Sequence, residues 1–373
     1  MTRGAARLFW SASCDPPAIS RRQLLVGGGA ALAAGVVAPG LARAADDGAA
    51  IIRQHATSPD DPWAVCHGVR AMGRDFTLKN GRRAVDFLLE TQLVSLPANG
   101  KSALGFPSQV EVHQNMFLKT LLEAGVPLDY GFAHQGSRRT LRDVVEGARA
   151  LFRPSQVAGT PNALPWSLIA FARTTSPLKP RWTNAWGEAV ELDVVVEIAL
   201  RLLERASLPL EQTMRANQPE TSKAPVHDFT CGGTHMIYGL LAAMQSGYTG
   251  KDRLERVRRQ VDLLVWRLRA DLELIGRFYA ARGAEKGVYW YHGDAKVKLL
   301  GHVEECLAFG IARGIVTLTA AQQGERRAAV AALRRMIEDM EQKNMAEARE
   351  IDRELFQQLV GDVCHAHHGL AFA

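Results

Sequence analysis

The sequence predicts an all-α fold, in which five or six helical hairpins form one ring-shaped domain over residues 62–373. Two observations lead to this prediction. Apolar residues recur at helical spacing along most of the chain, and the period-two alternation of Val, Ile and Thr that is typical of strands is nearly absent. In addition, helices that are apolar on all sides alternate along the chain with helices that have one charged face.

Residues 1–44, which precede the helices, have the features of an export signal that is removed. Arg21 and Arg22 stand just before a weakly hydrophobic stretch, residues 24–37, and Ala42-Arg43-Ala44 supplies the small-x-small pattern of a cleavage site. The arginine pair predicts export by the twin-arginine (Tat) translocase, which would be a transient partner, and a periplasmic or secreted location. A Sec signal is the alternative. The stretch is too short and too glycine-rich to predict a stable membrane anchor.

Removing this segment also removes most of the net charge. Residues 1–44 contain five arginines and one aspartate, so the formal charge of +6 for the whole chain falls to about +2 for residues 45–373. No basic stripe with interleaved aromatic residues remains, and nucleic acid is not expected as a partner. Residues 45–61 are predicted to be a linker, and no later segment has the pattern of a transmembrane helix.

The apolar helices occur six times, and their starts are mostly about 50 to 70 residues apart, which suits a helical hairpin with its loops. Their predicted ranges are residues 62–73, 111–126, 163–175, 228–248, 298–314 and 362–373. The charged helices between them are predicted at residues 80–93, 141–154, 188–207, 252–282 and 324–360, with a break near Asn344 in the last range.

The alternation of apolar and charged helices predicts two concentric layers, with the apolar helices inside. If the sixth apolar helix packs beside the first, the ring closes and neither end needs a cap. This layout resembles the α/α-toroid fold of lanthionine cyclases, terpenoid cyclases, protein prenyltransferases and several glycan hydrolases and lyases. An open α-solenoid is the alternative, although the spacing of the helices is irregular for a repeat array.

Cysteine and histidine concentrate in the apolar helices. One cysteine, Cys14, lies in the signal, and the other four lie in apolar helices: Cys66, Cys231, Cys306 and Cys364. Three of these four have a histidine four residues away, which is just over one helical turn, so both side chains project from one face. The pairs are Cys231 with His235, His302 with Cys306, and Cys364 with His368.

Thiolate and imidazole are ligands that suit zinc and similar transition metals. In a ring, the apolar helices line one central funnel, which would bring distant residues together. We therefore expect one metal site with ligands drawn from a single set: Cys66, His67, Cys231, His235, His302, Cys364 and His368. An enzymatic zinc ion would keep three protein ligands and leave one position for water or substrate. Glu305 is a further ligand or the general base.

The tripeptide Cys66-His67-Gly68 resembles the Cys-His-Gly zinc element of the lanthionine cyclases, in which a further Cys from a neighbouring inner helix completes the ligand set. In this chain the tripeptide stands on the first apolar helix, and the Trp-Cys-x-Gly partner motif of that family is absent. The resemblance implies a zinc ion at the axis of the ring.

Other interpretations of the same residues stay open. Four cysteines in an exported protein could form two disulfides, with Cys66 and Cys364 as one pair if their helices are neighbours. The cysteines could also be small core residues, with histidines that satisfy polar neighbours. A third possibility is a Cys–His nucleophilic pair, which requires a thiolate that is activated by a nearby imidazolium.

A metal-independent glycan lyase or hydrolase is the second functional hypothesis, and a non-catalytic scaffold or binding protein is the third. Aromatic residues in predicted loops could stack on sugar faces: Trp182, Trp186, Tyr289, Trp290 and Tyr291. A lyase would need a group such as His113 to neutralise a uronate. A hydrolase would need two carboxyl groups, for which Asp228, Asp294 and Glu305 are available. The expected ligand is therefore a small molecule or a glycan.

Overall fold

The computed structural model describes residues 47–218, 223–283 and 285–372, and the predicted signal, residues 1–44, lies outside these ranges. Most of the described chain is helical, which confirms the prediction of a mainly α-helical protein. None of the described helices combines the length and apolar character that are needed to cross a bilayer.

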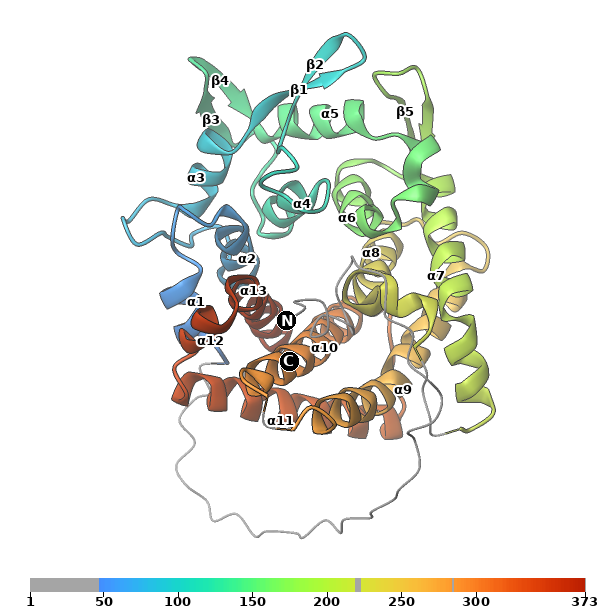
Figure 1. The fold of residues 1–373 in the computed structure, drawn as a ribbon. Coiled ribbons are helices and arrows are strands. Elements are labelled where there is room, and N and C mark those ends of the chain that lie inside the picture. The colour runs from blue at the N-terminus through green and yellow to red at the C-terminus, as the bar shows by residue number, and fades with distance from the viewer. Residues whose placement is uncertain (1–46, 219–222, 284, 373) are drawn as a thin grey trace.

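Six helices form the inner layer around the centre of the molecule (Figure 1): α2 (Pro62–Met72), α4 (Met116–Glu123), α6 (Leu164–Thr174), α8 (Thr234–Gln245), α10 (Val288–Ala312) and α13 (Arg353–Leu370). Each of them contacts the next one along the chain, and α13 contacts α2, so the contacts run in a closed circle. Each also overlaps one of the six apolar ranges predicted from the sequence.

Five further helices lie outside this circle: α3 (Ala84–Thr91), α5 (Leu141–Leu151), α7 (Leu192–Arg215), α9 (Arg253–Ala280) and α11 (Ala320–Gln342). Asn344, with a backbone φ of 55°, ends the α11 region, as the sequence predicts. The short helix α12 (Glu347–Ile351) follows this break and packs against α13. The predicted linker, residues 45–61, contains another short helix, α1 (Ala49–His55), which also packs against α13.

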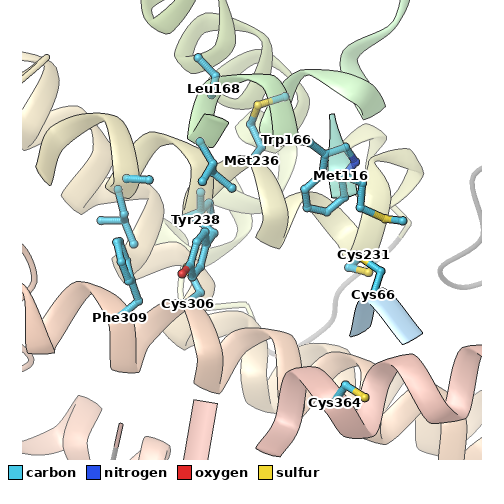
Figure 2. Packing of buried hydrophobic residues seen from close by; sticks show 14 of the residues in the cluster. Cys66, Met116, Trp166, Leu168, Cys231, Met236, Tyr238, Cys306, Phe309 and Cys364 are labelled. Carbon is cyan, nitrogen blue, oxygen red and sulfur yellow. The ribbon is translucent and has the colours of Figure 1, made fainter. Parts of the chain in front are cut away.

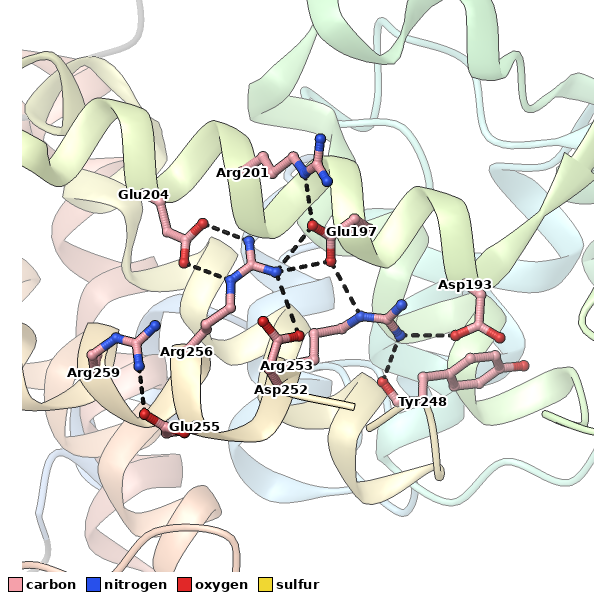
Figure 3. A network of polar contacts seen from close by, with 10 residues as sticks. All are labelled: Asp193, Glu197, Arg201, Glu204, Tyr248, Asp252, Arg253, Glu255, Arg256 and Arg259. Atoms are coloured by element: carbon pink, nitrogen blue, oxygen red, sulfur yellow. Dashed lines mark hydrogen bonds and ion pairs between the residues drawn. The ribbon is translucent and has the colours of Figure 1, made fainter. Parts of the chain in front are cut away.

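Charged side chains on the outer helices α7 and α9 pair with one another. Figure 3 shows the network between α7 and α9, in which Arg256 contacts Glu197 at 3.0 Å and Glu204 at 2.6 Å. Arg253 contacts Asp193 at 2.8 Å in the same network. Ion pairs near a protein surface each contribute about 0–1 kcal/mol, so this network adds only modestly to stability.

Three short antiparallel hairpins connect inner helices with outer ones in the described chain. They are β1 (Val94–Ala98) with β2 (Lys101–Gly105), β3 (Gly131–His134) with β4 (Ser137–Thr140), and β5 (Arg181–Thr183) with β6 (Ala189–Glu191). Trp182 on β5 donates a hydrogen bond to the carbonyl oxygen of Arg149 and packs against Phe171, so this aromatic residue anchors a hairpin to the helices.

The prediction that residues 289–291 form a loop is wrong. These residues lie in the first turn of α10, and Trp290 is only 4% exposed. Their aromatic side chains belong to the apolar face that α10 turns toward its neighbours, so they extend the helix ten residues before its predicted start at 298. α13 likewise begins at Arg353, although the sequence predicts an apolar helix only from residue 362.

Two glycines allow α10 and α13 to approach each other closely. A Cβ atom added to Gly301 would lie 3.0 Å from the Cβ of Ala366, and one added to Gly369 would lie 2.6 Å from the backbone nitrogen of Glu305. Because neither position has room for a side chain, the two helix backbones pack almost directly against each other. This contact brings the polar faces of α10 and α13 to the same point at the centre of the ring.

Candidate metal centre

A cavity of about 560 Å³ lies at the centre of the ring. All six inner helices contribute side chains to its wall, including His67 from α2, Lys119 from α4 and Trp166 from α6. His235 from α8, His302 from α10 and His365 from α13 complete the circuit. The cavity is therefore the place where residues that are far apart in the sequence meet.

Three of the predicted ligands form a compact cluster in this wall. Cys231, His235 and His302 each offer one ligand atom, and these atoms all lie within 4.8 Å of one another. The Sγ atom of Cys231 is 3.3 Å from Nε2 of His302, and the rings of His235 and His302 are 4.6 Å apart. All three residues are buried. One thiol and two imidazoles form a donor set that fits a zinc-like ion with an open fourth position.

An unusual turn, η4 (Thr230–Gly233), places the thiol of this cluster. Cys231 has a φ of 49°, and Gly232 and Gly233, which follow it, have φ values of 59° and 81°. A left-handed backbone costs free energy at a residue with a Cβ atom, and such residues persist where the surrounding structure determines them. Gly233 is the N-cap of α8, which begins at Thr234, so His235 stands in the first turn of that helix.

A buried ionic network holds this turn from behind. Nη1 of Arg267, on α9, donates a hydrogen bond of 2.8 Å to the carbonyl oxygen of Gly232. Nη2 of Arg267 is 2.9 Å from Oδ2 of Asp271, and Nε2 of His227 is 3.3 Å from the other oxygen of that carboxylate. Arg267 and Asp271 are almost completely inaccessible to solvent. The network therefore fixes the conformation that presents Cys231 to the cavity.

Replacing Arg267 by Met should destabilise the protein by about 3–5 kcal/mol, because it leaves the buried Asp271 carboxylate without its cation. The measurement is the free energy of unfolding in urea. Arg269→Met is the matched control, since Arg269 lies on the same helix and is exposed; its effect should stay within about 0.5 kcal/mol. Equal stability of the two variants would show that the network does not support the turn.

On α10 and α13, the cluster continues into a carboxylate that the sequence interpretation does not include. Nε2 of His302 lies 3.0 Å from Oδ1 of Asp362, as well as close to Cys231. Nζ of Lys298 is 3.7 Å from Oδ2 of Asp362 and 3.1 Å from Oδ2 of Asp294. Burial raises the pKa of Asp362 to about 6 and that of Asp294 to about 7. With both carboxyl groups ionised, the three side chains carry one net negative charge.

The histidine of α13 that lines the cavity is His365, whereas the sequence points to His368. Nδ1 of His365 lies 2.7 Å from Oε2 of Glu305, and donation from this nitrogen leaves the lone pair of the neutral ring on Nε2. The ring is 4.0 Å from that of His302 and 5.2 Å from that of His235. A carboxylate that orients an imidazole in this way is typical of the surroundings of a metal site.

A second group of ligand atoms, from His302, Glu305 and His365, is also compact. Its carboxylate, however, is already engaged: Nε of Arg70 contacts Oε1 of Glu305 at 2.8 Å, and Nδ1 of His368 lies 2.8 Å from the same oxygen. A cation placed there would face the buried Arg70 guanidinium. The group around Cys231 is therefore the better candidate, and Glu305 acts as the residue that orients His365.

The remaining predicted ligands lie apart from the cluster. His67 lines the cavity, but its Nδ1 is 2.8 Å from the carbonyl oxygen of Trp63 and its ring is 5.2 Å from that of His365. Cys66 and Cys364 are buried outside the cavity wall. Burial raises the pKa of the Cys66 thiol to about 12. The four cysteines in the described chain are free thiols, so the structure contains neither of the disulfides that the sequence leaves open.

The three candidate catalytic residues are also separated. His113 lines the cavity, and its ring is 5.3 Å from that of Trp166. Glu305 lies behind His365. Asp228 is outside the cavity, with its side chain 64% exposed and an ion pair of 2.7 Å to Lys223. No pair formed from Asp228, Asp294 and Glu305 faces the cavity as two free carboxyl groups, so these three residues do not form the carboxyl pair that a glycoside hydrolase needs.

A Cys–His nucleophile fits the cluster less well than a metal does. Burial, together with the nearby Asp362 carboxylate, raises the pKa of the Cys231 thiol well above its usual value. Burial also lowers the pKa of His302 to about 3, so no imidazolium is present to stabilise a thiolate. A bound divalent cation would reverse the first effect, because it stabilises the thiolate, and it is compatible with the second, because it binds the neutral imidazole.

The chain has no significant match among protein-family profiles, curated proteins or solved structures. The function is therefore inferred from the site itself.

Proposed function

We propose that the protein is a metal-dependent hydrolytic enzyme, with a zinc-like ion held by Cys231, His235 and His302 in the wall of the central cavity. The observation that carries the proposal is the convergence of one thiol and two imidazoles, from η4, α8 and α10, within 4.8 Å of one another beside a cavity large enough for a small molecule. A bound zinc ion would polarise a carbonyl group or lower the pKa of a water molecule at the open position.

The residues around the cluster support catalysis of this type. Asp362, 3.0 Å from the proposed ligand His302, is placed to accept a proton from a water molecule at the open position. Lys298 contacts the carboxylate of Asp362 and holds it in place. His365, oriented by Glu305, presents a lone pair to the same region and serves as a hydrogen-bond acceptor or as an additional ligand.

Charge balance supports a cation at this position. Lys298 with ionised Asp294 and Asp362 carries one net negative charge, while the buried pair Arg70 and Lys119 is matched by Glu123 and Glu305. At a pH at which both carboxyl groups are ionised, a divalent ion with one thiolate ligand adds one positive charge and offsets the excess of this carboxylate pair. Buried charge without a partner is costly, so the ionised pair favours a bound cation beside it.

We further propose that the closed circle of inner helices is an α/α toroid, and that residues 1–44 direct the folded protein to the Tat translocase. The contacts between successive inner helices support the first proposal, and the paired Arg21 and Arg22 support the second. Export in the folded state would allow the metal to be loaded in the cytoplasm, before the enzyme works in the periplasm or outside the cell.

Elemental analysis of the protein, purified without a histidine-rich tag, tests this proposal. We expect close to one equivalent of zinc or a similar metal, and metal-dependent hydrolysis in a panel of esters, amides and glycosides that stops with a chelator and returns with zinc. Less than about a tenth of an equivalent after growth with zinc, with no binding of added zinc, would overturn the proposal.

A further inference from the structure

Beside the proposed metal ligands, three buried nitrogen donors line the same cavity. They are the guanidinium of Arg70 on α2, the ammonium of Lys119 on α4 and the indole of Trp166 on α6. The side chains of Arg70 and Lys119 are 2% and 3% exposed, and Trp166 is 3% exposed. Figure 2 shows Trp166 beside Met116, in the region that also holds Cys231.

The two cations lie close together. Both contact the same oxygen, Oε2 of Glu123, and the Nζ atom of Lys119 does so at 2.9 Å. Arg70 and Lys119 also lie 5.0 Å and 5.7 Å from the centre of the Tyr238 ring. A single small anion could therefore reach both.

Two of the donor groups lack an acceptor among the described residues. Nη2 of Arg70 and Nε1 of Trp166 are buried, and no described atom meets hydrogen-bond geometry at either of them. Tyr238 interacts with Arg70, but its hydroxyl donates at 2.9 Å to Oε1 of Glu123. Buried N–H groups without an acceptor cost free energy, so a ligand that supplies oxygen atoms would be bound here.

Short contacts connect these donors to the proposed metal site. Glu305 bridges Arg70, at 2.8 Å, and His365, at 2.7 Å. On the other side, Nζ of Lys119 is 5.6 Å from the centre of the Trp166 ring, and that ring is 4.1 Å from the ring of His235. A molecule in the cavity can thus touch the donors with one end and the metal site with the other.

We infer that Arg70, Lys119 and Trp166 bind the carboxylate of the substrate, and that the substrate is a small carboxylic acid with its hydrolysable carbonyl group at the metal. The second half of this inference rests on the proposed function, while the first does not. Glu123 and Glu305 already balance the charges of Arg70 and Lys119, so the three donors offer hydrogen bonds with little excess positive charge. A monoanionic carboxylate therefore suits these donors better than a phosphate dianion, which would bring two negative charges.

Calorimetric titration with N-acetylglycine tests the inference, because this probe carries a carboxylate and an amide carbonyl. Its neutral analogue, N-acetylglycinamide, is the matched ligand. We expect the metal-free protein to bind the acid at least about tenfold more tightly than the amide, as a charge-assisted hydrogen bond predicts. Lys119→Met and Trp166→Phe should each remove about tenfold in affinity. Trp166→Phe keeps the ring and removes only the N–H donor, so it provides a test even if Lys119→Met fails to fold.

Lys101→Met, at an exposed position on β2, is the control and should leave the dissociation constant unchanged. Equal binding of acid and amide, or unchanged affinity in both Lys119→Met and Trp166→Phe, would overturn the carboxylate site. Zinc should tighten the binding of the acid to the wild type but not to Cys231→Ser. If the protein prefers the acid but zinc has no effect on binding, the carboxylate site is supported. The proposal that the carbonyl group of the substrate lies at a metal ion is then wrong.

Discussion

Replacing Cys231 by Ser should lower the affinity for zinc by more than about 100-fold, since the loss of even an outer hydrogen-bond partner of a ligand typically costs 10- to 100-fold. Sγ of Cys231 lies 3.3 Å from Nε2 of His302 and is the one sulfur in the cluster of ligand atoms. The measurement is a titration of metal-free protein with Co²⁺, in which a thiolate ligand produces a charge-transfer band. The variant should lose this band.

Cys364→Ser provides the matched control, because Cys364 is also a buried thiol but lies outside the cavity wall. It should keep the charge-transfer band and bind zinc with unchanged affinity. The proposed ligand set is wrong if the band survives in Cys231→Ser, or if the two variants lose it equally.

Replacing Glu305 by Gln should lower the free energy of unfolding by about 3–5 kcal/mol, because it removes the charge that pairs with the buried guanidinium of Arg70. The neighbouring Glu304 is an internal control. Its carboxylate is also buried, but it pairs with Arg326, whose side chain is 20% exposed and can be solvated after the pair is lost. We expect Glu304→Gln to change stability by no more than about 1 kcal/mol. Similar losses in both variants would mean that Glu305 is an ordinary buried acid.

The pH dependence of these two variants should differ in sign. Burial acts to raise the pKa of Glu305, but the Arg70 guanidinium and His365 outweigh it and hold the pKa well below its usual value. The stabilisation by Glu305 is therefore complete above the usual carboxyl pKa of about 4.3 and is lost as the pH falls below it. Urea unfolding between pH 7 and pH 3 should show the wild type and Glu305→Gln converging.

Glu304 should behave in the opposite way. Burial raises the pKa of this carboxyl group, and Arg326 only partly offsets the effect, so ionisation of Glu304 costs stability as the pH rises. Glu304→Gln should therefore gain relative stability toward neutral pH. A parallel pH profile for the two variants would contradict the assigned roles.

The two helical layers could be predicted from the sequence because a helix that is buried on all sides is apolar all round, whereas a helix that is buried on one side keeps a charged face. The hairpins could not, since a strand such as Lys101–Gly105 is short, contains no β-branched residue and is held in place by a neighbouring helix. The early start of α13 was also hidden, because its first two turns carry polar side chains, including Gln357 and Gln358, that line the cavity.

The candidate site could be predicted only in part, because spacing along a helix shows which residues share a face but does not show which face points inward. The Cys231–His235 spacing identifies two residues that do meet, whereas Cys306 and Cys364 face the apolar core. Lys298, His302 and Glu305 repeat the spacing of Gln358, Asp362 and His365. These two polar rows on otherwise buried helices are the signal that would have identified Asp362 and His365.

The unbroken circle of inner-helix contacts restricts how a ligand can arrive. Each inner helix contacts another inner helix on both sides, so the part of the chain that the structure describes does not divide into two lobes joined by a hinge. A ligand of the proposed enzyme would therefore enter along the ring axis, for example past residues 109–113, where Val112 is 71% exposed and lines the cavity. An entrance bordered by packed helices would admit narrow molecules more readily than branched ones.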